Sequence, residues 1–352
     1  MKKKELQLEK EELNKEKSIN KTHTSILSSR KENLSTKNKD EMEQTFFTIF
    51  TPIYNRKRLI HRVWESLLAQ TNQNFEWIVI DNGSNDGIEE LLEEYQSKAT
   101  FPMKVIYQKD SGKYLALNRV VHIAKGELLF PADSDDTFEP NLIERMTEVW
   151  AKYKAEDISG ITGLCKYENG EVVGDEFPFK EGVSTIEEIF YKQRIGGEKW
   201  GCIRVDVLKK YPYPTNFGVR YFPDQYIWDQ IGFNYKTVFV NEVFRTYFQD
   251  AGDQITKQKY HSKEEMRMKN FYTLFQINYQ FSRVGKYLPM KEYLGKFGYL
   301  WLTTFRSGTS IFEVFKKLES PKSKIVAFFT LLPTYLVHVF NLGSMFHRKL
   351  DL

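Results

Sequence analysis

The sequence predicts an α/β fold, in which a mostly parallel sheet is flanked by helices and followed by a helical C-terminal extension. Apolar runs of strand length alternate with helical apolar stripes between residues 46 and 153. The connections between them are short, as in βαβ units. From Tyr260 onward the pattern becomes helical and rich in Phe, Tyr, Lys and Arg.

The expected elements follow one another closely. Residues 58–69 carry a helical stripe that includes Leu59, Val63 and Leu67. The other expected helices are 88–95, 114–124, 141–153 and a short one beginning in 222–230. The expected strands are 46–50, 75–80, 103–107, 127–130 and 236–240.

Length and composition allow a sizeable core and exclude several classes of protein. Of the 352 residues, 41% are hydrophobic and 15% aromatic, which excludes global disorder. Cys165 and Cys202 are the only cysteines, so a disulfide scaffold and a cysteine-rich zinc site are excluded and a reducing compartment is favoured. No apolar stretch follows the basic residues 2–4, so no secretory signal peptide is expected.

The net charge of +4 is the sum of three unlike parts. Residues 1–45 hold 11 basic and 9 acidic side chains and no aromatic one, which predicts a disordered or frayed helical tail. Leu6 and Leu13 lie one heptad apart, so an oligomerisation segment is the alternative. Residues 46–253, with a net charge of −8, are predicted to form the α/β domain, and residues 254–352, with +10, a basic aromatic helical region.

Polar residues are concentrated directly after three of the predicted strands. These clusters are residues 51–56, 81–87 and 133–136. Ligands bind at the carboxyl ends of the strands in such sheets, so the three clusters are expected to converge on one crevice.

Three carboxylates occur within four residues at 133–136, and like charges this close are costly without a cation. Oxygen ligands suit Mg²⁺ or Mn²⁺, which would also bridge a substrate diphosphate. A solvated acidic turn is the alternative. Asp81 at the end of its strand could accept hydrogen bonds from a base or ribose, or could simply stabilise the turn.

The order and spacing of four segments resemble the family 2 (GT-A) glycosyltransferases over about residues 46–250. These segments are 50–56 (FTPIYNR), 79–87 (VIDNGSNDG), 112–118 (GKYLALN) and 126–140 (GELLFPADSDDTFEP). The resemblance implies a GT-A catalytic domain and a metal-dependent, inverting transfer of a sugar from a nucleoside diphosphate. Asn82 departs from the family, which usually has a second Asp there.

The resemblance also implies roles for individual residues. Asp135 would be the metal ligand of a DxD-like motif, and Asp81 would bind the base or ribose. Lys113 would lie near the donor. The implied nucleotide-binding residues are Thr51, Pro52, Tyr54, Arg56, Asp81, Lys113, Asp133 and Ser134.

Inverting transfer needs a general base on a segment other than that of Asp135. Segment 222–230 (FPDQYIWDQ) is similar to the family's Glu-Asp pattern and makes Asp224 the base, although Pro223 replaces the first acid. Asp224 could instead cap the following helix. Asp229 is the rival base, on a different helical face.

Segment 195–200 (IGGEKW) resembles the acceptor side of the family, with Glu198 in place of Asp. Trp200 and Trp228 could present flat faces to a sugar, or could be ordinary core residues. The candidates for the acceptor or for other roles are Asp136, Glu198, Lys199, Trp200 and Trp228.

No other catalytic signature is present. Gly112-Lys113 is not a P-loop, because Tyr114 stands where Ser or Thr is needed. There is no HExxH or GxSxG, and the His residues are scattered, which disfavours a His-based site.

Residues 325–346 contain no Asp, Glu, Lys or Arg. As a helix they would reach roughly 33 Å, enough for a bilayer. Pro333, Thr334, His338 and Asn341 interrupt the stretch and basic residues flank it, which favours an interfacial helix on anionic lipid. Core packing and a true span are the alternatives, and nucleic acid binding is ranked last.

The sequence therefore predicts an inverting glycosyltransferase. Its partners would be a nucleotide sugar, expected to be UDP-linked, and a cell-surface glycan or lipid-linked glycan. It would use Mg²⁺ or Mn²⁺ and work in the cytoplasm, peripheral to the cytoplasmic membrane face. A nucleotidyltransferase, or a catalytically silent nucleotide-sugar-binding scaffold of the same fold, is the alternative.

Overall fold

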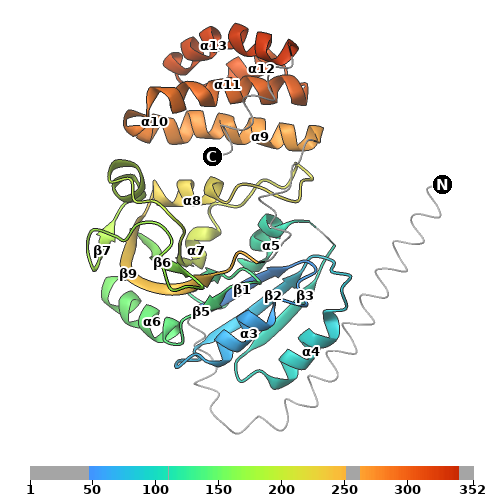
Figure 1. Cartoon of the computed structure of the whole chain (residues 1–352), viewed down its shortest axis with the longest axis vertical. Helices are drawn as coiled ribbons and strands as arrows, with labels where there is room; N and C mark the ends of the chain where they lie inside the picture. Colours follow the sequence, from blue (N-terminus) through green and yellow to red (C-terminus); the bar gives the residue numbers. More distant parts are fainter. Residues whose placement is uncertain (1–46, 110, 251–261, 341–352) are drawn as a thin grey trace, which may run out of the picture. The chain divides into compact units, whose positions relative to one another are not determined.

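The computed structural model describes residues 47–109, 111–250 and 262–340 (Figure 1). The tail expected at residues 1–45 lies outside the described residues. Within them, nine strands form one sheet in the order β3-β2-β1-β4-β8-β6-β9-β5, with β7 paired to β9. The strands are β1 (Phe47–Ile53), β2 (Phe75–Asp81), β3 (Met103–Tyr107), β4 (Leu128–Pro131), β5 (Thr137–Phe138), β6 (Ile158–Tyr167), β7 (Glu181–Ser184), β8 (Lys199–Arg204) and β9 (Lys236–Tyr247).

The first four strands in this order are parallel, as βαβ connections require. Side chains alternate between two apolar layers: Trp77 packs on one face of the sheet and the adjacent Ile78 on the other. The flanking elements are α3 (His61–Leu68), α4 (Glu89–Lys98), α5 (Lys113–Val120), α6 (Leu142–Tyr153), η1 (Glu187–Lys192), α7 (Val205–Leu208) and α8 (Gln225–Gly232). The predicted α/β fold and its flanking helices are confirmed.

The antiparallel strands β6 and β8 were not expected from the sequence. Both contain glycines, which weaken a strand pattern. The structure shows why they are there: a Cβ on Gly201 would collide with the Ile161 carbonyl, and one on Gly160 with the Cys202 carbonyl. Glycine thus permits the close approach of these two backbones.

The C-terminal extension is helical, as expected, over residues 262–340. Its first helix begins with a capping box, in which Ser262 and Glu265 satisfy each other's backbone N–H groups. Phe271 and Phe275 pack against Tyr226 of α8. The elements are α9 (Lys263–Phe275), η3 (Gln276–Gln280), α10 (Phe281–Val284), η4 (Gly285–Tyr287), α11 (Met290–Ser307), α12 (Ile311–Lys317) and α13 (Pro321–Val339).

The described helices include none that combines the length and apolarity needed to cross a bilayer. For residues 325–340 this disfavours the spanning alternative, and residues 341–346 of that stretch lie outside the description.

Candidate active site

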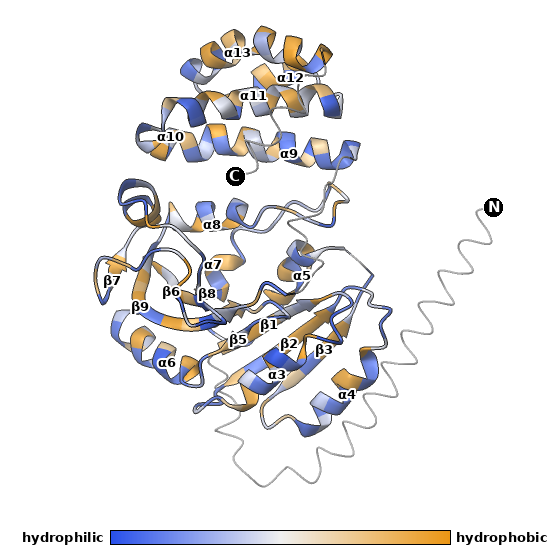
Figure 2. Ribbon diagram, viewed as in Figure 1, coloured by the Kyte–Doolittle hydropathy of each residue, from blue (hydrophilic) through white to orange (hydrophobic). Residues whose placement is uncertain are grey.

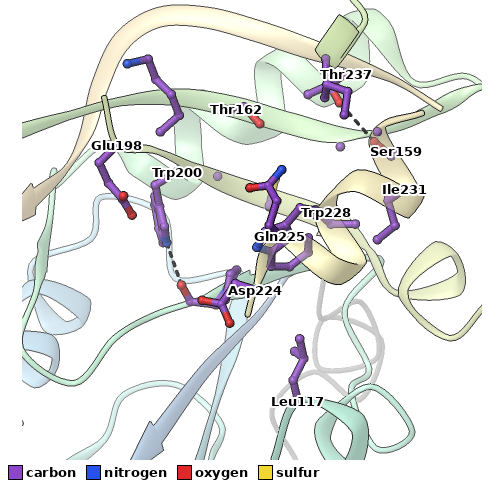
Figure 3. A pocket seen from close by; sticks show the side chains of 18 of the residues that line it. Leu117, Ser159, Thr162, Glu198, Trp200, Asp224, Gln225, Trp228, Ile231 and Thr237 are labelled. Carbon is purple, nitrogen blue, oxygen red and sulfur yellow. Dashed lines mark hydrogen bonds between the residues drawn. The ribbon is translucent and has the colours of Figure 1, made fainter. Parts of the chain in front are cut away.

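A cavity of about 580 Å³ is lined by Asp133 of one predicted polar cluster, whereas no residue of the clusters 51–56 and 81–87 lines it. Lys113 and Asp133 line it together with residues of β6, β8, η1 and α8. Figure 3 draws its lining, with Glu198 and Trp200 contributed by one side and Asp224, Gln225 and Trp228 by another. The volume is within the range of small-molecule sites.

Hydrogen bonds join the loops that follow β1 and β2. The Asn55 N–H donates to Ser84 Oγ at 2.8 Å, and the Asn85 N–H donates back to Asn55 Oδ1 at 2.8 Å. Asn55 has a φ of 52°, a left-handed conformation that Asn tolerates better than most residues. Residue-by-residue prediction missed Asn55 and Ser84, although both lie inside the polar clusters.

Asp81 is almost fully buried at the end of β2. Its Oδ1 accepts a hydrogen bond from the Ser84 hydroxyl at 2.5 Å. Burial raises the pKa of Asp81, and the hydrogen bonds from Ser84 oppose this. The neighbouring Asn82 accepts a hydrogen bond from the Gln108 amide at 2.8 Å, so the amide at this family-atypical position is accommodated without a charge.

The predicted nucleotide-binding residues at the end of β1 and directly after it differ in their burial. Thr51 is fully buried and its hydroxyl accepts a hydrogen bond from the Trp77 indole at 2.9 Å, so its side chain supports the sheet. Pro52 and Arg56 are half-buried. The ring of Tyr54 is exposed and stacks beneath the Arg220 guanidinium at 4.4 Å.

Lys113 lies close to two acidic residues of the site, Asp133 and Asp224. Its Nζ lies 2.6 Å from Asp133 Oδ1 and 3.7 Å from Asp224 Oδ2. Burial opposes the charged amine, but Asp133 and Asp224 outweigh it and raise the pKa of Lys113. Burial likewise opposes the charge on Asp133, yet Lys113 and Arg245 lower its pKa. Lys113 and Asp224 are 111 residues apart in the sequence but lie close together in the fold.

Asp136 forms a buried ion pair with Arg245 of β9. Asp136 Oδ2 lies 2.8 Å from Arg245 Nε, and both side chains are almost completely buried. The angle does not meet hydrogen-bond geometry, so the contact is an ion pair rather than a hydrogen bond. Burial raises the pKa of Asp136 well above its ordinary value, and Arg245 opposes this. The role of Asp136 in this structure is therefore structural, and Ser134 beside it is buried as well.

Asp135, like Asp133, is only half-buried, whereas Asp136 is buried. Burial and the nearby Asp133 carboxylate raise the pKa of Asp135. No group of three or more His, Cys, Asp or Glu side chains suited to a metal occurs in the described part of the chain. The residues present thus fit an ion held by Asp135 and completed by substrate and water oxygens, not a preformed protein cage.

Asp224 stands immediately before α8, at its N-cap position. Its side chain makes no capping hydrogen bond, so the geometry does not support the capping alternative. The carboxylate instead lines the cavity and lies 3.4 Å from the Tyr213 hydroxyl, which donates to it.

Asp229, the rival base, is fully buried one turn further along α8. Its Oδ1 accepts hydrogen bonds from Gln225 Nε2 at 2.5 Å and from the Tyr191 hydroxyl at 3.4 Å. The same Tyr191 oxygen accepts from Gln280 of η3 at 2.6 Å, which connects Asp229 to the C-terminal helices. Burial raises the pKa of Asp229 to about 6, while Gln225, Tyr191 and Lys296 oppose the shift.

This shift predicts a specific pH dependence of stability. The folded-state pKa exceeds the unfolded value of about 3.9, so the folded protein holds the proton more tightly and the ionised form is penalised. The free energy of unfolding should fall as pH rises from about 4 to about 6. Asp229→Asn cannot ionise, so its stability relative to the parent should improve by about 3 kcal/mol between pH 4 and pH 7, measured by urea unfolding. A difference that stays constant over this range would contradict the prediction.

Three of the remaining predicted residues lie in β8 or directly before it, and the fourth, Trp228, lies in α8. Trp200 lines the cavity, but it is largely buried and its indole donates to the Pro131 carbonyl at 2.7 Å. Lys199 Nζ donates to the Gly196 carbonyl at 2.7 Å, and burial lowers its pKa. Glu198 faces the cavity with Arg245 at 3.5 Å, and Trp228 lines it from α8.

Comparison with known proteins identifies the family that the chain resembles. Residues 48–211 match the model of the family described as Glycosyl transferase family 2. An uncharacterized glycosyltransferase of Methanocaldococcus jannaschii is 24% identical over 201 residues, which is 54% of this chain and 69% of that protein. Glycosyltransferase GlyG of Streptococcus pneumoniae is 29% identical over 153 residues, which is 42% of this chain and 49% of that protein.

Other relatives also match over only part of their own length. The Bacillus subtilis glycosyltransferase TuaG, provisionally named for teichuronic acid biosynthesis, is 30% identical over 160 residues, 45% of this chain and 60% of that protein. The match spans only about a third of two further relatives.

Among solved structures, the fold is similar to S. aureus TarS 1-349 in complex with UDP-GlcNAc. The TM-score is 0.55 and the sequence identity 17%, over 82% of this chain and 80% of that one. The resemblance predicted from the four segments is confirmed: through residues 48–211, the chain belongs to glycosyl transferase family 2.

Proposed function

We propose that this glycosyltransferase transfers a sugar, with inversion, from a nucleoside diphosphate to a hydroxyl of a cell-surface glycan or lipid-linked glycan. The observation that carries the proposal is Lys113, which contacts Asp133 on the donor side and Asp224 on the acceptor side of one cavity. Residues 47–250 would form the catalytic domain. The names of TarS with UDP-GlcNAc and of TuaG support a UDP-linked donor and a wall-polymer or surface-glycan acceptor.

The donor would lie along the loops after β1 and β2. Asp81 would accept hydrogen bonds from the base or ribose, and the exposed Tyr54 ring could stack on the nucleotide. Asp133 would act mainly through Lys113, whose charge it fixes beside the diphosphate.

Asp224 would accept the proton of the acceptor hydroxyl. The hydroxyl oxygen then forms the new bond to the anomeric carbon, while the bond from that carbon to the diphosphate oxygen breaks. The diphosphate leaves with the electron pair. Glu198 and Trp228, which also line the cavity, would help hold the acceptor.

Asp135 would hold a Mg²⁺ or Mn²⁺ ion, which neutralises charge on the leaving diphosphate when bound. The half-buried setting beside Asp133 favours a cation at this carboxylate. The protein's own contribution would be to hold the Asp135 carboxylate facing the diphosphate.

The test uses Asp135→Asn and thermal unfolding. The parent should be stabilised by UDP-sugars more strongly with Mn²⁺ than with chelator, because a ligand of the folded state raises the unfolding midpoint. Asp135→Asn should lose this metal-dependent part and keep its midpoint without ligand. Asp157→Asn, which alters an exposed carboxylate paired with Lys236, is the matched control and should behave like the parent.

Full metal-dependent stabilisation in Asp135→Asn would overturn the metal assignment. The released product separates the chemistries: nucleoside diphosphate supports sugar transfer, whereas pyrophosphate would mean a nucleotidyltransferase. Stabilisation without any release would mean a binding scaffold.

A further inference from the structure

The helix α13 carries its large apolar side chains on the outside. Phe329 is 72% exposed, and it has similarly exposed neighbours along the helix. Figure 2 shows the apolar colouring that runs along α12 and α13. The exposed apolar residues of α13 are Ile325, Phe328, Phe329, Leu332, Leu336 and Val339.

The buried residues of the same helix are small, and Val326 and Leu331 pack beside them against the core of the C-terminal helices. Ser323, Ala327 and Thr334 are buried. The Trp301 indole of α11 donates to the Ala327 carbonyl at 2.9 Å and to the Thr330 hydroxyl at 3.2 Å. In a helix that packs on a core in water, the apolar stripe normally faces inward, so this arrangement is inverted.

The two faces are separated by the helical repeat. At about 100° per residue, the six exposed apolar residues fall within an arc of about 100°, and the buried ones are centred on the opposite side. Lys322 and Lys324 lie just outside the two edges of the apolar arc. A one-sided stripe with basic edges is the pattern of a helix lying in a membrane interface.

The preceding helix extends this surface. Phe312 of α12 is 77% exposed, and Lys316 and Lys317 at the end of α12 are exposed as well. We call Phe312 and the six residues of α13 the outer apolar face. Large apolar side chains exposed in this number mark an interaction site.

The charge of the C-terminal region favours anionic lipid as the partner of the outer apolar face. Residues 254–352 hold 16 basic and 6 acidic side chains, a balance of +10. This excess complements anionic phospholipid, whereas a second copy of the same surface would repel it. At 19 residues α13 reaches about 28 Å, and one of its sides is covered by α11, so it suits a lipid surface rather than a span.

We propose that the outer apolar face of α12 and α13 inserts into the interface of an anionic phospholipid membrane, with the four lysines at the headgroups. This proposal rests in part on the proposed function, because a lipid-linked or cell-surface acceptor is one reason to expect the protein at a membrane surface. Membrane binding is measured without donor or acceptor, so a failure to bind vesicles would not contradict the proposed transfer reaction. A failure of the transfer reaction would likewise not contradict membrane binding.

The experiment measures cosedimentation of the full chain with vesicles of phosphatidylcholine containing one-third phosphatidylglycerol, and with phosphatidylcholine alone. The parent should prefer the anionic vesicles. Phe328→Ser/Phe329→Ser/Leu332→Ser should reduce the bound-to-free ratio at least tenfold and keep the unfolding midpoint, because these side chains are largely exposed. Lys322→Gln/Lys324→Gln should reduce it about tenfold on anionic vesicles at low salt, an effect that high salt removes.

The matched control is Leu68→Ser/Val183→Ser, which removes exposed apolar side chains from α3 and β7 and should bind like the parent. Equal binding by the triple variant and the parent would overturn the proposal, as would an absence of vesicle binding. A parent that is oligomeric in sedimentation velocity and becomes monomeric in the triple variant, with no lipid binding, would make a second copy the occupant.

Discussion

Asp224→Asn should lower sugar transfer by roughly 10²–10⁴-fold, the usual contribution of general acid–base catalysis. The amide cannot accept the acceptor's proton, while its size and position are kept. The free energy of unfolding should change by no more than about 1 kcal/mol, because the carboxylate makes no capping hydrogen bond and lines the cavity. Initial rates of nucleoside diphosphate release with acceptor present, together with urea unfolding, measure both quantities.

Asp229→Asn on the same background is the matched control for this prediction. Asp229 is fully buried in a network with Gln225 and Tyr191, so its substitution should leave transfer within a fewfold of the parent at neutral pH. Donor affinity of Asp224→Asn, measured by thermal stabilisation, should hardly change. If Asp224→Asn keeps near-normal turnover while Asp229→Asn is inactive, Asp229 is the base.

Arg245→Met should destabilise the fold by about 3–5 kcal/mol, the usual result of removing one partner of a buried ion pair. The substitution leaves Asp136 almost completely buried without its cation. Chemical unfolding at pH 7 measures the loss. The double variant Asp136→Leu/Arg245→Met should recover part of it, because no charge then remains uncompensated.

A surface ion pair provides the comparison. Lys98 pairs with Glu94 one turn earlier on α4, with both side chains exposed. Lys98→Met should cost no more than about 0.5 kcal/mol. A loss in Arg245→Met as small as that in Lys98→Met would mean that Asp136 is protonated or solvated and that the pair does not hold β9 to the acidic loop.

The parallel half of the sheet was predictable because its signal is local. Each strand from β1 to β4 is a short apolar run followed by polar turn residues. Hydrogen bonds join the clusters after β1 and β2, but of the three clusters only the one after β4 contributes to the cavity lining, through Asp133. The glycines of β6 and β8 carry no such signal, because their reason is the close approach of a partner strand that is distant in sequence.

The residues of the candidate site also divide into those that the sequence identified and those that depend on tertiary contacts. Asp133 was identified from its position after a predicted strand, and Lys113 from the family resemblance. The ion pair of Asp136 with Arg245 was not, because the two residues are joined only by tertiary contact. One signal was available: Arg245 is a charged residue inside the largely apolar β9, and a charge buried there needs a partner. The network of Asp229 with Tyr191 and Gln280 had no comparable signal.

The braced loops after β1 and β2 bear on how a donor would be received. Besides the two bonds of Asn55, the Lys57 N–H donates to Asp86 Oδ2 at 2.8 Å and Lys57 Nζ donates to the Gly87 carbonyl at 2.7 Å. These contacts restrict backbone freedom of both loops, and the entropy of ordering them is lost during folding. A nucleotide that binds to these loops would then contact a preorganised surface, so little of its interaction energy would be needed to order the protein.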